Sequence, residues 1–213
     1  MTLKRFVPHI EIEQMLMAQG YSLVAGVDEV GRGPLAGPVV TAAVVLKKGC
    51  CLPDVRDSKM LTDAARRLLV PEIIEQCESY GVGIVDSAEI DRINILQATF
   101  AAMRQSLNAV NAQAVIVDGS LSIPECDLFQ HVLPKADRIS LSVAAASVIA
   151  KVTRDDIMTE FGRSYPQYGF DKHKGYASAA HFEALDEHGP CRIHRQSFLV
   201  RWRERTAQGS LSL

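Results

Sequence analysis

The sequence has no long hydrophobic run. Its apolar stretches last only a handful of residues, whereas a membrane-spanning helix needs about 20. The first residues, MTLKRFVPHIEIEQ, lack an apolar core and include acids early, which is not the pattern of a secretory signal. We therefore expect a cytoplasmic protein that does not interact with membranes.

Paired cysteines and excess positive charge are also lacking. The five cysteines are odd in number and include no Cys-x-x-Cys pair, so neither a disulfide framework nor a zinc ribbon is indicated. The net charge of −2 excludes a globally basic nucleic-acid-binding protein. Bases do gather near the end of the chain, at Arg192, Arg195, Arg201, Arg203 and Arg205. On charge alone, we interpret this group as a solvated helix face rather than a binding surface.

No repeat, low-complexity tract or Pro/Gly-rich linker divides the chain. Its 213 residues suit one domain with a sizeable core. We expect a single domain over residues 1–213, with a lead-in of about 20 residues and a loose tail from about residue 207. Nothing in the sequence demands more than a monomer.

Apolar runs and helical periodicities alternate along the chain. They predict strands at 22–30, 38–46, 80–85, 114–117 and 129–133, and helices at 62–77, 88–110, 142–161, 181–187 and 197–205. The first two strands should pair antiparallel, and the second helix should break near Asn94. The apolar stripe of the first helix consists of Leu68, Leu69, Ile73 and Ile74. This order predicts an α/β fold with a mixed sheet flanked by helices and a helical C-terminal part.

Acidic residues follow two of the expected strands. One strand ends in Asp28-Glu29, and another leads directly into Asp118. If these strands are parallel neighbours, Asp28 and Asp118 meet at one edge of the sheet, and Asp137 lies in a loop before a helix. Clustered carboxylates repel one another, and oxygen-only ligands favour Mg²⁺ or Mn²⁺. Two such ions, roughly 3.5–4 Å apart, would clamp the attacking and leaving oxygens of a phosphodiester.

Each acid also has an ordinary structural explanation, as a turn residue or a helix cap. Neighbours on a strand point to opposite faces, so Glu29 joins Asp28 at one ion only if the strand bends or Glu29 uses its backbone carbonyl. Asp155 lies beyond Asp137 along an expected helix, and at ~1.5 Å per residue it is too distant to share the ions. We expect Asp155 to be structural and to pair with Arg154 or another nearby base.

A series of motifs resembles ribonuclease HII, the bacterial type 2 ribonuclease H. The matching segments are VDEVGRGP (27–34), DSK (57–59), EIDRINIL (89–96), VDG (117–119), SVAAASVIAKVTRD (142–155), YPQYGFDKHKGY (165–176) and HRQSF (194–198). They run in order over about residues 22–198, which makes the series far more specific than any one segment.

The resemblance implies the ribonuclease H fold, with a central five-stranded mixed sheet flanked by helices. It implies endonucleolytic cleavage of the RNA strand of RNA/DNA hybrids, leaving 5′-phosphate and 3′-hydroxyl ends. It also implies that Asp28, Glu29, Asp118 and Asp137 are the catalytic acids that bind Mn²⁺ or Mg²⁺, with two ions in the catalytic complex. The family usually has Lys-Gly-Asp where this chain has Lys135-Ala136-Asp137. If that glycine takes a positive φ, alanine would cost about 1 kcal/mol or shift the loop.

Two segments are candidates for recognising the substrate. An enzyme that cuts RNA must sense the 2′-hydroxyl, and the glycines of Gly31-Arg32-Gly33 let backbone groups approach a sugar while Arg32 holds a phosphate. The resemblance gives this motif the role of recognising the ribonucleotide. It implies that Tyr176 packs on the deoxyribose that follows, which would allow incision 5′ to a single ribonucleotide embedded in duplex DNA. The alternatives are a plain hairpin turn and a half-buried loop tyrosine.

Three further side chains are candidates for phosphate contacts. Lys59 is one, and Ser147 and Lys151, one turn apart on a helix, are the others. The alternative for the helical pair is an ordinary helix surface. The last six residues, Gln208–Leu213, resemble the short Gln…Leu-x-Leu peptides with which bacterial proteins bind the replication sliding clamp. The alternative there is a disordered end.

Two other functions fit the sequence less well. A catalytically silent hybrid-binding protein would lack one of the acids, and none is missing. A junction resolvase or integrase-type nuclease would share the acids, but Gly31–Gly33 beside them and the HKGY segment at 173–176 argue against it.

Overall fold

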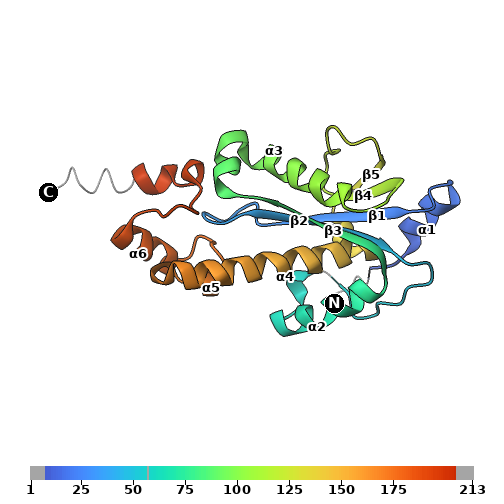
Figure 1. The fold of residues 1–213 in the computed structure, drawn as a ribbon, viewed down its shortest axis with the longest axis horizontal. Helices are drawn as coiled ribbons and strands as arrows, with labels where there is room; N and C mark the ends of the chain where they lie inside the picture. The colour runs from blue at the N-terminus through green and yellow to red at the C-terminus, as the bar shows by residue number, and fades with distance from the viewer. Residues whose placement is uncertain (1–7, 57, 205–213) are drawn as a thin grey trace, which may run out of the picture.

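The fold is a five-stranded mixed sheet between two layers of helices (Figure 1). The computed structural model describes residues 8–56 and 58–204. The strands are β1 (Val24–Val30), β2 (Val39–Leu46), β3 (Cys77–Val85), β4 (Ala114–Asp118) and β5 (Phe129–Leu133). The α-helices are α1 (Glu11–Ala18), α2 (Asp63–Glu75), α3 (Ser87–Asn108), α4 (Leu141–Ser164), α5 (Phe170–His173) and α6 (Ala179–His188). Short 3-10 turns are η1 (Ser58–Met60), η2 (Ala136–Arg138), η3 (Pro166–Tyr168) and η4 (Gln196–Phe198).

The strand order is β3-β2-β1-β4-β5. β1 pairs antiparallel with β2, as the sequence predicted, and parallel with β4, which meets the condition set for Asp28 and Asp118. β5 is the edge strand beyond β4. Val27 lies opposite Val117 across the parallel pair. The next residues, Asp28 and Asp118, therefore lie side by side at the same edge of the sheet.

Alternate residues of β1 face the two helical layers. Ala25 and Val27 pack with Phe100 and Met103 of α3 on one face. Gly26 faces α4 on the other, where a Cβ atom would lie 2.3 Å from the backbone nitrogen of Val143. The absence of a side chain at Gly26 thus lets α4 pack with its backbone directly against the sheet.

Several element boundaries follow local side-chain caps. The Asn94 side chain accepts hydrogen bonds from the backbone N–H groups of Leu96 and Gln97, at 3.0 and 3.1 Å. Asn94 itself is non-helical, with φ 68° and ψ 163°, so it breaks α3 as predicted and caps the second half. Ser140 caps α4 by accepting from the N–H of Val143.

α1 lies inside the segment that the sequence analysis treated as a lead-in. Its Leu16 is fully buried. Its Glu13 is also buried and accepts hydrogen bonds from the Ser140 hydroxyl at 2.7 Å and from the Ser142 N–H at 2.9 Å. α1 therefore supplies a carboxylate to the N-terminus of α4, where negative charge is stabilising.

Two of the four residues expected in the buried apolar stripe of α2 are exposed instead. Leu69 and Ile73 are buried, but Leu68 is 71% exposed and Ile74 39% exposed. The third inward position of this helix belongs to Arg66, a cation, which hydrophobic periodicity does not detect. The helix also ends at Glu75, and β3 begins at Cys77 rather than at residue 80.

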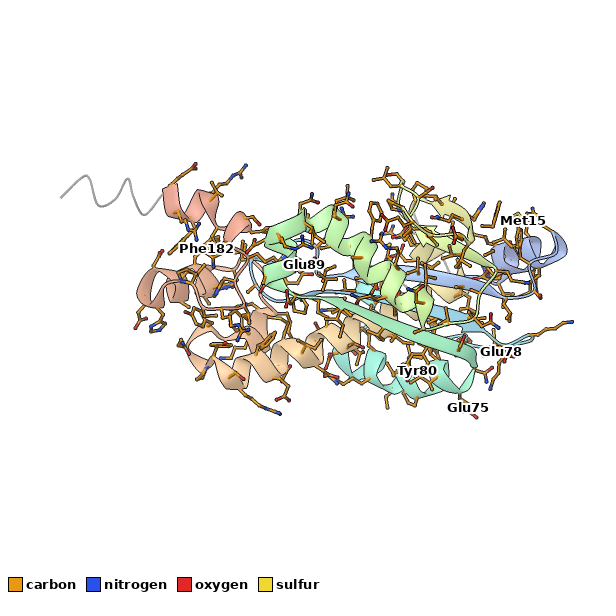
Figure 2. All side chains as sticks on the ribbon, turned by 45° about the horizontal axis from the view of Figure 1, so that its top comes forward. Met15, Glu75, Glu78, Tyr80, Glu89 and Phe182 are labelled. Atoms are coloured by element: carbon orange, nitrogen blue, oxygen red, sulfur yellow. The ribbon has the colours of Figure 1, made fainter. Side chains whose placement is uncertain are left out.

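The C-terminal elements gather at one end of the sheet. Figure 2 shows Phe182 of α6 and Glu89 of α3 at this end, with Met15, Glu75 and Glu78 at the other. The expected helix at 197–205 is divided into η4 and a helical turn at residues 200–204, and the expected tail from residue 207 lies outside the described residues. Within the described ranges, no helix is long and apolar enough to cross a membrane.

The contact of α4 with β1 is testable with Gly26→Ala. The added methyl meets backbone atoms of Ser142 and Val143 at 2.4 and 2.3 Å, and neither can move without shifting α4. We expect the free energy of unfolding in urea to fall by about 1–3 kcal/mol. Gly33→Ala is the control, because a Cβ there has no atom within 4 Å. Equal stability of the two variants would contradict this account of the packing.

Candidate functional site

Asp28 and Asp118 lie at one edge of the sheet on two parallel strands, and Glu29 lines a pocket together with Asp118. Asp28 is on the same side of β1 as Gly26, facing α4, and is only 6% exposed. The Glu29 side chain lies on the opposite side of β1, in a pocket that Arg32, Leu96 and Asp118 also line. The regular strand therefore separates the Asp28 and Glu29 side chains, as strand geometry requires.

Asp28 is buried among other negative charges. Burial raises the pKa of its carboxyl group well above the usual value, and the charges of Glu29 and Asp118 raise it further. A hydrogen bond from the Ser147 hydroxyl opposes this increase. The charged groups acting on Asp28 are thus carboxylates, so its negative charge is disfavoured as the site stands.

Glu29 has positive neighbours. Burial raises its pKa, but the guanidinium of Arg32, 3.3 Å away, acts in the opposite direction. Asp118 raises the pKa and Lys59 lowers it. Arg32 and Lys59, both expected to contact substrate, therefore already lie within electrostatic reach of a candidate catalytic acid.

A hydrogen bond connects Asp118 to the turn that carries Asp137. The Asp118 carboxylate accepts a 2.8 Å hydrogen bond from the backbone N–H of Ala136. Asp137 follows in η2 and is buried. The positive φ in this segment, 62°, belongs to Lys135, so alanine at 136 incurs no left-handed strain. Ala136 is fully buried in the core, and its methyl group is part of the packing beside the site.

The donor set fits a divalent cation, although the side chains are not gathered around one point. Among the described residues, no group of three or more His, Cys, Asp or Glu side chains converges closely enough to hold an ion. The Asp118 carboxylate is turned toward Ala136 and the Glu29 carboxylate toward Arg32. The nearby donors are nevertheless carboxylate oxygens, which suit Mg²⁺ and Mn²⁺, and a cation would offset the repulsion at Asp28.

The Ser147 side chain is buried rather than exposed on the helix surface. Its hydroxyl lies 2.9 Å from that of Ser58 and hydrogen-bonds to Asp28. Because Ser147 is only 3% exposed, a substrate phosphate would have to displace Ser58 to reach it. The phosphate contact expected of Ser147 stays a prediction, and its hydroxyl faces Ser58 in this structure.

Asp155 is structural and pairs with nearby bases, as expected, and these bases are Lys151 and Arg66. Lys151 lies 2.6 Å from one carboxylate oxygen of Asp155, and Arg66 lies 3.8 Å from the other. Arg66 also donates to the carbonyl oxygen of Ser58 at 2.9 Å. This network holds the turn that carries Ser58 and Lys59 against α4. The prediction of Arg154 or another nearby base as the partner is thus met by Lys151, and Arg154 binds elsewhere.

Two fully buried arginines hold the Gly31–Pro38 loop through its backbone. Arg195 donates to the carbonyl oxygens of Gly31, Arg32 and Gly37, at 2.6, 3.0 and 2.9 Å. Arg154 donates to the carbonyl oxygens of Pro38, Lys174 and Ala36, at 3.0, 3.0 and 3.3 Å. Arg195 is therefore not part of a solvated basic face.

The same bonds connect the loop to Tyr176. The Arg154 guanidinium lies over the Tyr176 ring, 5.7 Å from its centre. The Leu35 N–H donates to the carbonyl oxygen of Gly175 at 2.8 Å. Tyr176 is 45% exposed, and Gly33 is exposed with open space around it. The Gly31–Gly33 segment and Tyr176, which are both expected to contact the substrate, are therefore linked by direct contacts.

Sequence reasoning missed Arg154 and Arg195 as site-building residues. Both lie inside motif segments, VTRD and HRQSF, but neither segment indicates that its arginine binds carbonyl oxygens far away in the chain. Asp91 was missed for the same reason. Its carboxylate accepts from the N–H groups of Gln196 and Ser197, at 2.7 and 2.9 Å, and so fixes η4 to α3.

Comparison with known proteins identifies a family. A family model described as Ribonuclease HII matches residues 25–201. The ribonuclease HII of Geotalea daltonii is 49% identical over 191 residues, covering 89% of this chain and 88% of that protein. Among solved structures, ribonuclease H2 from Pyrococcus horikoshii OT3 is similar, with 31% identity, a TM-score of 0.68 and coverage of 82% and 93% of the two chains. The chain solved in a PCNA:RNase HII complex from Archaeoglobus fulgidus is 28% identical, with a TM-score of 0.67 and coverage of 85% and 94%.

The charge imbalance at Asp28 predicts a stabilising substitution. Because the folded-state pKa is raised, folding favours the protonated carboxyl group, and stability falls as pH rises from the ordinary range of an aspartate toward the raised value. At pH 7 without divalent ions, Asp28→Asn should therefore melt at a higher temperature than the wild type. Added Mn²⁺ should stabilise the wild type more than the variant.

Thermal unfolding in EDTA and in excess MnCl₂ measures both effects. Asp54→Asn is the control, since Asp54 is exposed, and it should respond to Mn²⁺ like the wild type. A lower melting temperature for Asp28→Asn in EDTA at pH 7 is the contrary outcome.

Proposed function

This chain is a member of the ribonuclease HII family of endonucleolytic hydrolases, and from that membership we propose that it cleaves the RNA strand of RNA/DNA hybrids. We further propose that it incises duplex DNA 5′ to a single embedded ribonucleotide, leaving 5′-phosphate and 3′-hydroxyl ends. The observation that carries this proposal is the connection between the acidic site and the surface expected to contact the substrate. Asp28 and Asp118 lie side by side, and the Gly31–Gly33 segment directly follows β1 and is braced to Tyr176.

The acids Asp28, Glu29, Asp118 and Asp137 would hold the metal. Two Mn²⁺ or Mg²⁺ ions bound there would lower the pKa of an attacking water and stabilise the leaving 3′ oxygen. Asp28 is held by Ser147, and Asp118 by the N–H of Ala136. These hydrogen bonds limit the freedom of both carboxylates, which favours a reproducible geometry.

The Gly31–Gly33 backbone would read the 2′-hydroxyl. The carbonyl oxygens of Gly31 and Arg32 are occupied by Arg195, whereas Gly33 is exposed and free of neighbours on the side where a Cβ would lie. Gly33 is therefore the position where a sugar would approach most closely. Tyr176 would pack on the following deoxyribose, and Arg32, Lys59 and Lys151 would contact phosphates.

Cleavage assays on two substrates test this function. The wild type should cut a continuous RNA/DNA hybrid and a DNA duplex with one ribonucleotide, and EDTA or Asp118→Asn should lower both rates by about 10³-fold or more. Gly33→Ala should fold normally and lose incision at the single ribonucleotide more than cleavage of the continuous hybrid. Retained binding without cleavage of either substrate by the wild type would instead favour a silent hybrid-binding protein.

We also propose that Gln208–Leu213 binds the replication sliding clamp. This segment lies outside the described residues. The proposal rests on its two leucines and its glutamine, and on the similarity to a chain solved in a PCNA complex. A chain shortened by these six residues should cleave hybrids normally and lose heat of binding to a bacterial clamp in calorimetry. Unchanged affinity for the clamp would rule out this segment as the binding site.

A further inference from the structure

Three histidines pack together next to the backbone of Tyr176. His173 ends α5, His181 lies in α6, and His194 precedes η4. The exposed fractions of His181 and His194 are 0% and 1%. The rings of His173 and His181 stack with their centres 4.4 Å apart. Such burial requires every ring nitrogen to find a partner, because an unpaired one would be costly.

The partners of His181 and His194 determine where the protons lie. The Cys191 N–H donates to Nδ1 of His194 at 2.9 Å, closer than the Cys191 thiol at 3.2 Å and carbonyl oxygen at 3.3 Å, so that nitrogen acts as an acceptor and carries no proton. Nε2 of His194 lies 3.0 Å from Nε2 of His181, and Nδ1 of His181 lies 2.9 Å from the carbonyl oxygen of Tyr176. A carbonyl only accepts, so His181 donates from Nδ1 and accepts at Nε2, and His194 donates from Nε2.

The result is a one-way relay of hydrogen bonds between neutral rings. It begins at the Cys191 backbone, passes through His194 and His181, and ends at the Tyr176 carbonyl. A proton added to either ring would place two N–H donors face to face. Burial lowers the pKa of His181 and of His194 to about 4, which keeps both rings neutral at physiological pH.

The groups around the relay are consistent with neutral rings. His173 accepts from the Gly175 N–H at Nδ1, and its Nε2 lies 2.7 Å from the Tyr168 carbonyl oxygen, which makes it the donor there. The other ionisable side chains that face the rings are the Tyr168 phenol and the Cys191 thiol. Neither offers a carboxylate that would favour a protonated histidine.

We propose that His181 and His194 are positioning residues that fix the backbone of Tyr176 for reading a ribonucleotide–deoxyribonucleotide junction. The Tyr176 ring is held from one side by Arg154, and its carbonyl oxygen receives His181 and the Ser178 N–H, both at 2.9 Å. Backbone and ring are thus fixed by separate contacts. The reading role rests on the proposed function, whereas the proton positions do not.

The proton positions can be measured directly on the wild type. Long-range ¹H–¹⁵N spectra of the histidine rings at pH 7 should show His181 protonated at Nδ1 only and His194 protonated at Nε2 only. A protonated ring, or the opposite tautomer at His181, would overturn the relay whatever the enzyme cleaves.

Two amide variants of His181 test the positioning role. His181→Asn keeps a donor near the position of Nδ1 and can still bond the Tyr176 carbonyl. His181→Gln keeps a polar group near Nε2 and loses that bond. Relative to the wild type, His181→Gln should raise KM for the duplex with one ribonucleotide by about fivefold, with kcat and cleavage of the continuous hybrid within about twofold. His181→Asn should restore most of the loss in KM.

His188→Asn is the matched control, since His188 is exposed on the same helix. Equal effects of His181→Asn and His181→Gln, or equal effects on both substrates, would overturn the positioning role. If the wild type fails to incise at a single ribonucleotide, the role of Tyr176 in recognising the junction is wrong, as is that part of the proposed function. The spectra still test the hydrogen-bond relay in that case.

Discussion

The direct contact between α4 and β1 sets the position of almost every feature of the site. Val143 lies against Gly26, and one turn later Ser147 reaches Asp28. Lys151 and Asp155 follow on the same helix, and Arg154 reaches the loop after β1. A helix held this close to a strand keeps a fixed register with it, so the acids and the loop share a single rigid frame.

The site combines two opposite electrostatic environments on one strand. The carboxylates of Glu29 and Asp118 act on Asp28, whereas Glu29 has the cations Arg32 and Lys59 near it as well as Asp118. A cation entering on the Asp28 side would relieve repulsion, and one approaching Glu29 would compete with Arg32 for its carboxylate. The two acids should therefore differ in how strongly metal binding changes their surroundings.

The sequence predicted the sheet and the position of the acids because these features are local. An apolar run that ends in Asp28 or Asp118 identifies both the strand and its end, and parallel pairing brings the ends together. The break at Asn94 was readable for the same reason. The burial of Arg66, by contrast, depends on its hydrogen bonds to the carbonyl oxygens of Ser58 and Leu61 and on its ion pair with Asp155, and hydrophobic periodicity does not detect a buried cation.

The Gly31–Pro38 loop is held by residues that lie 116 to 164 positions later in the chain. Every one of these bonds ends on a main-chain carbonyl, so the side chains of the accepting residues take no part in them, and at Gly31 and Gly37 there is no room for a Cβ atom. The same arrangement has a cost during biosynthesis. When the ribosome has completed β4, both Asp28 and Asp118 exist, but Arg154 and Arg195 do not. A fragment that ends before α4 would contain the paired acids and lack the means to shape the loop beside them.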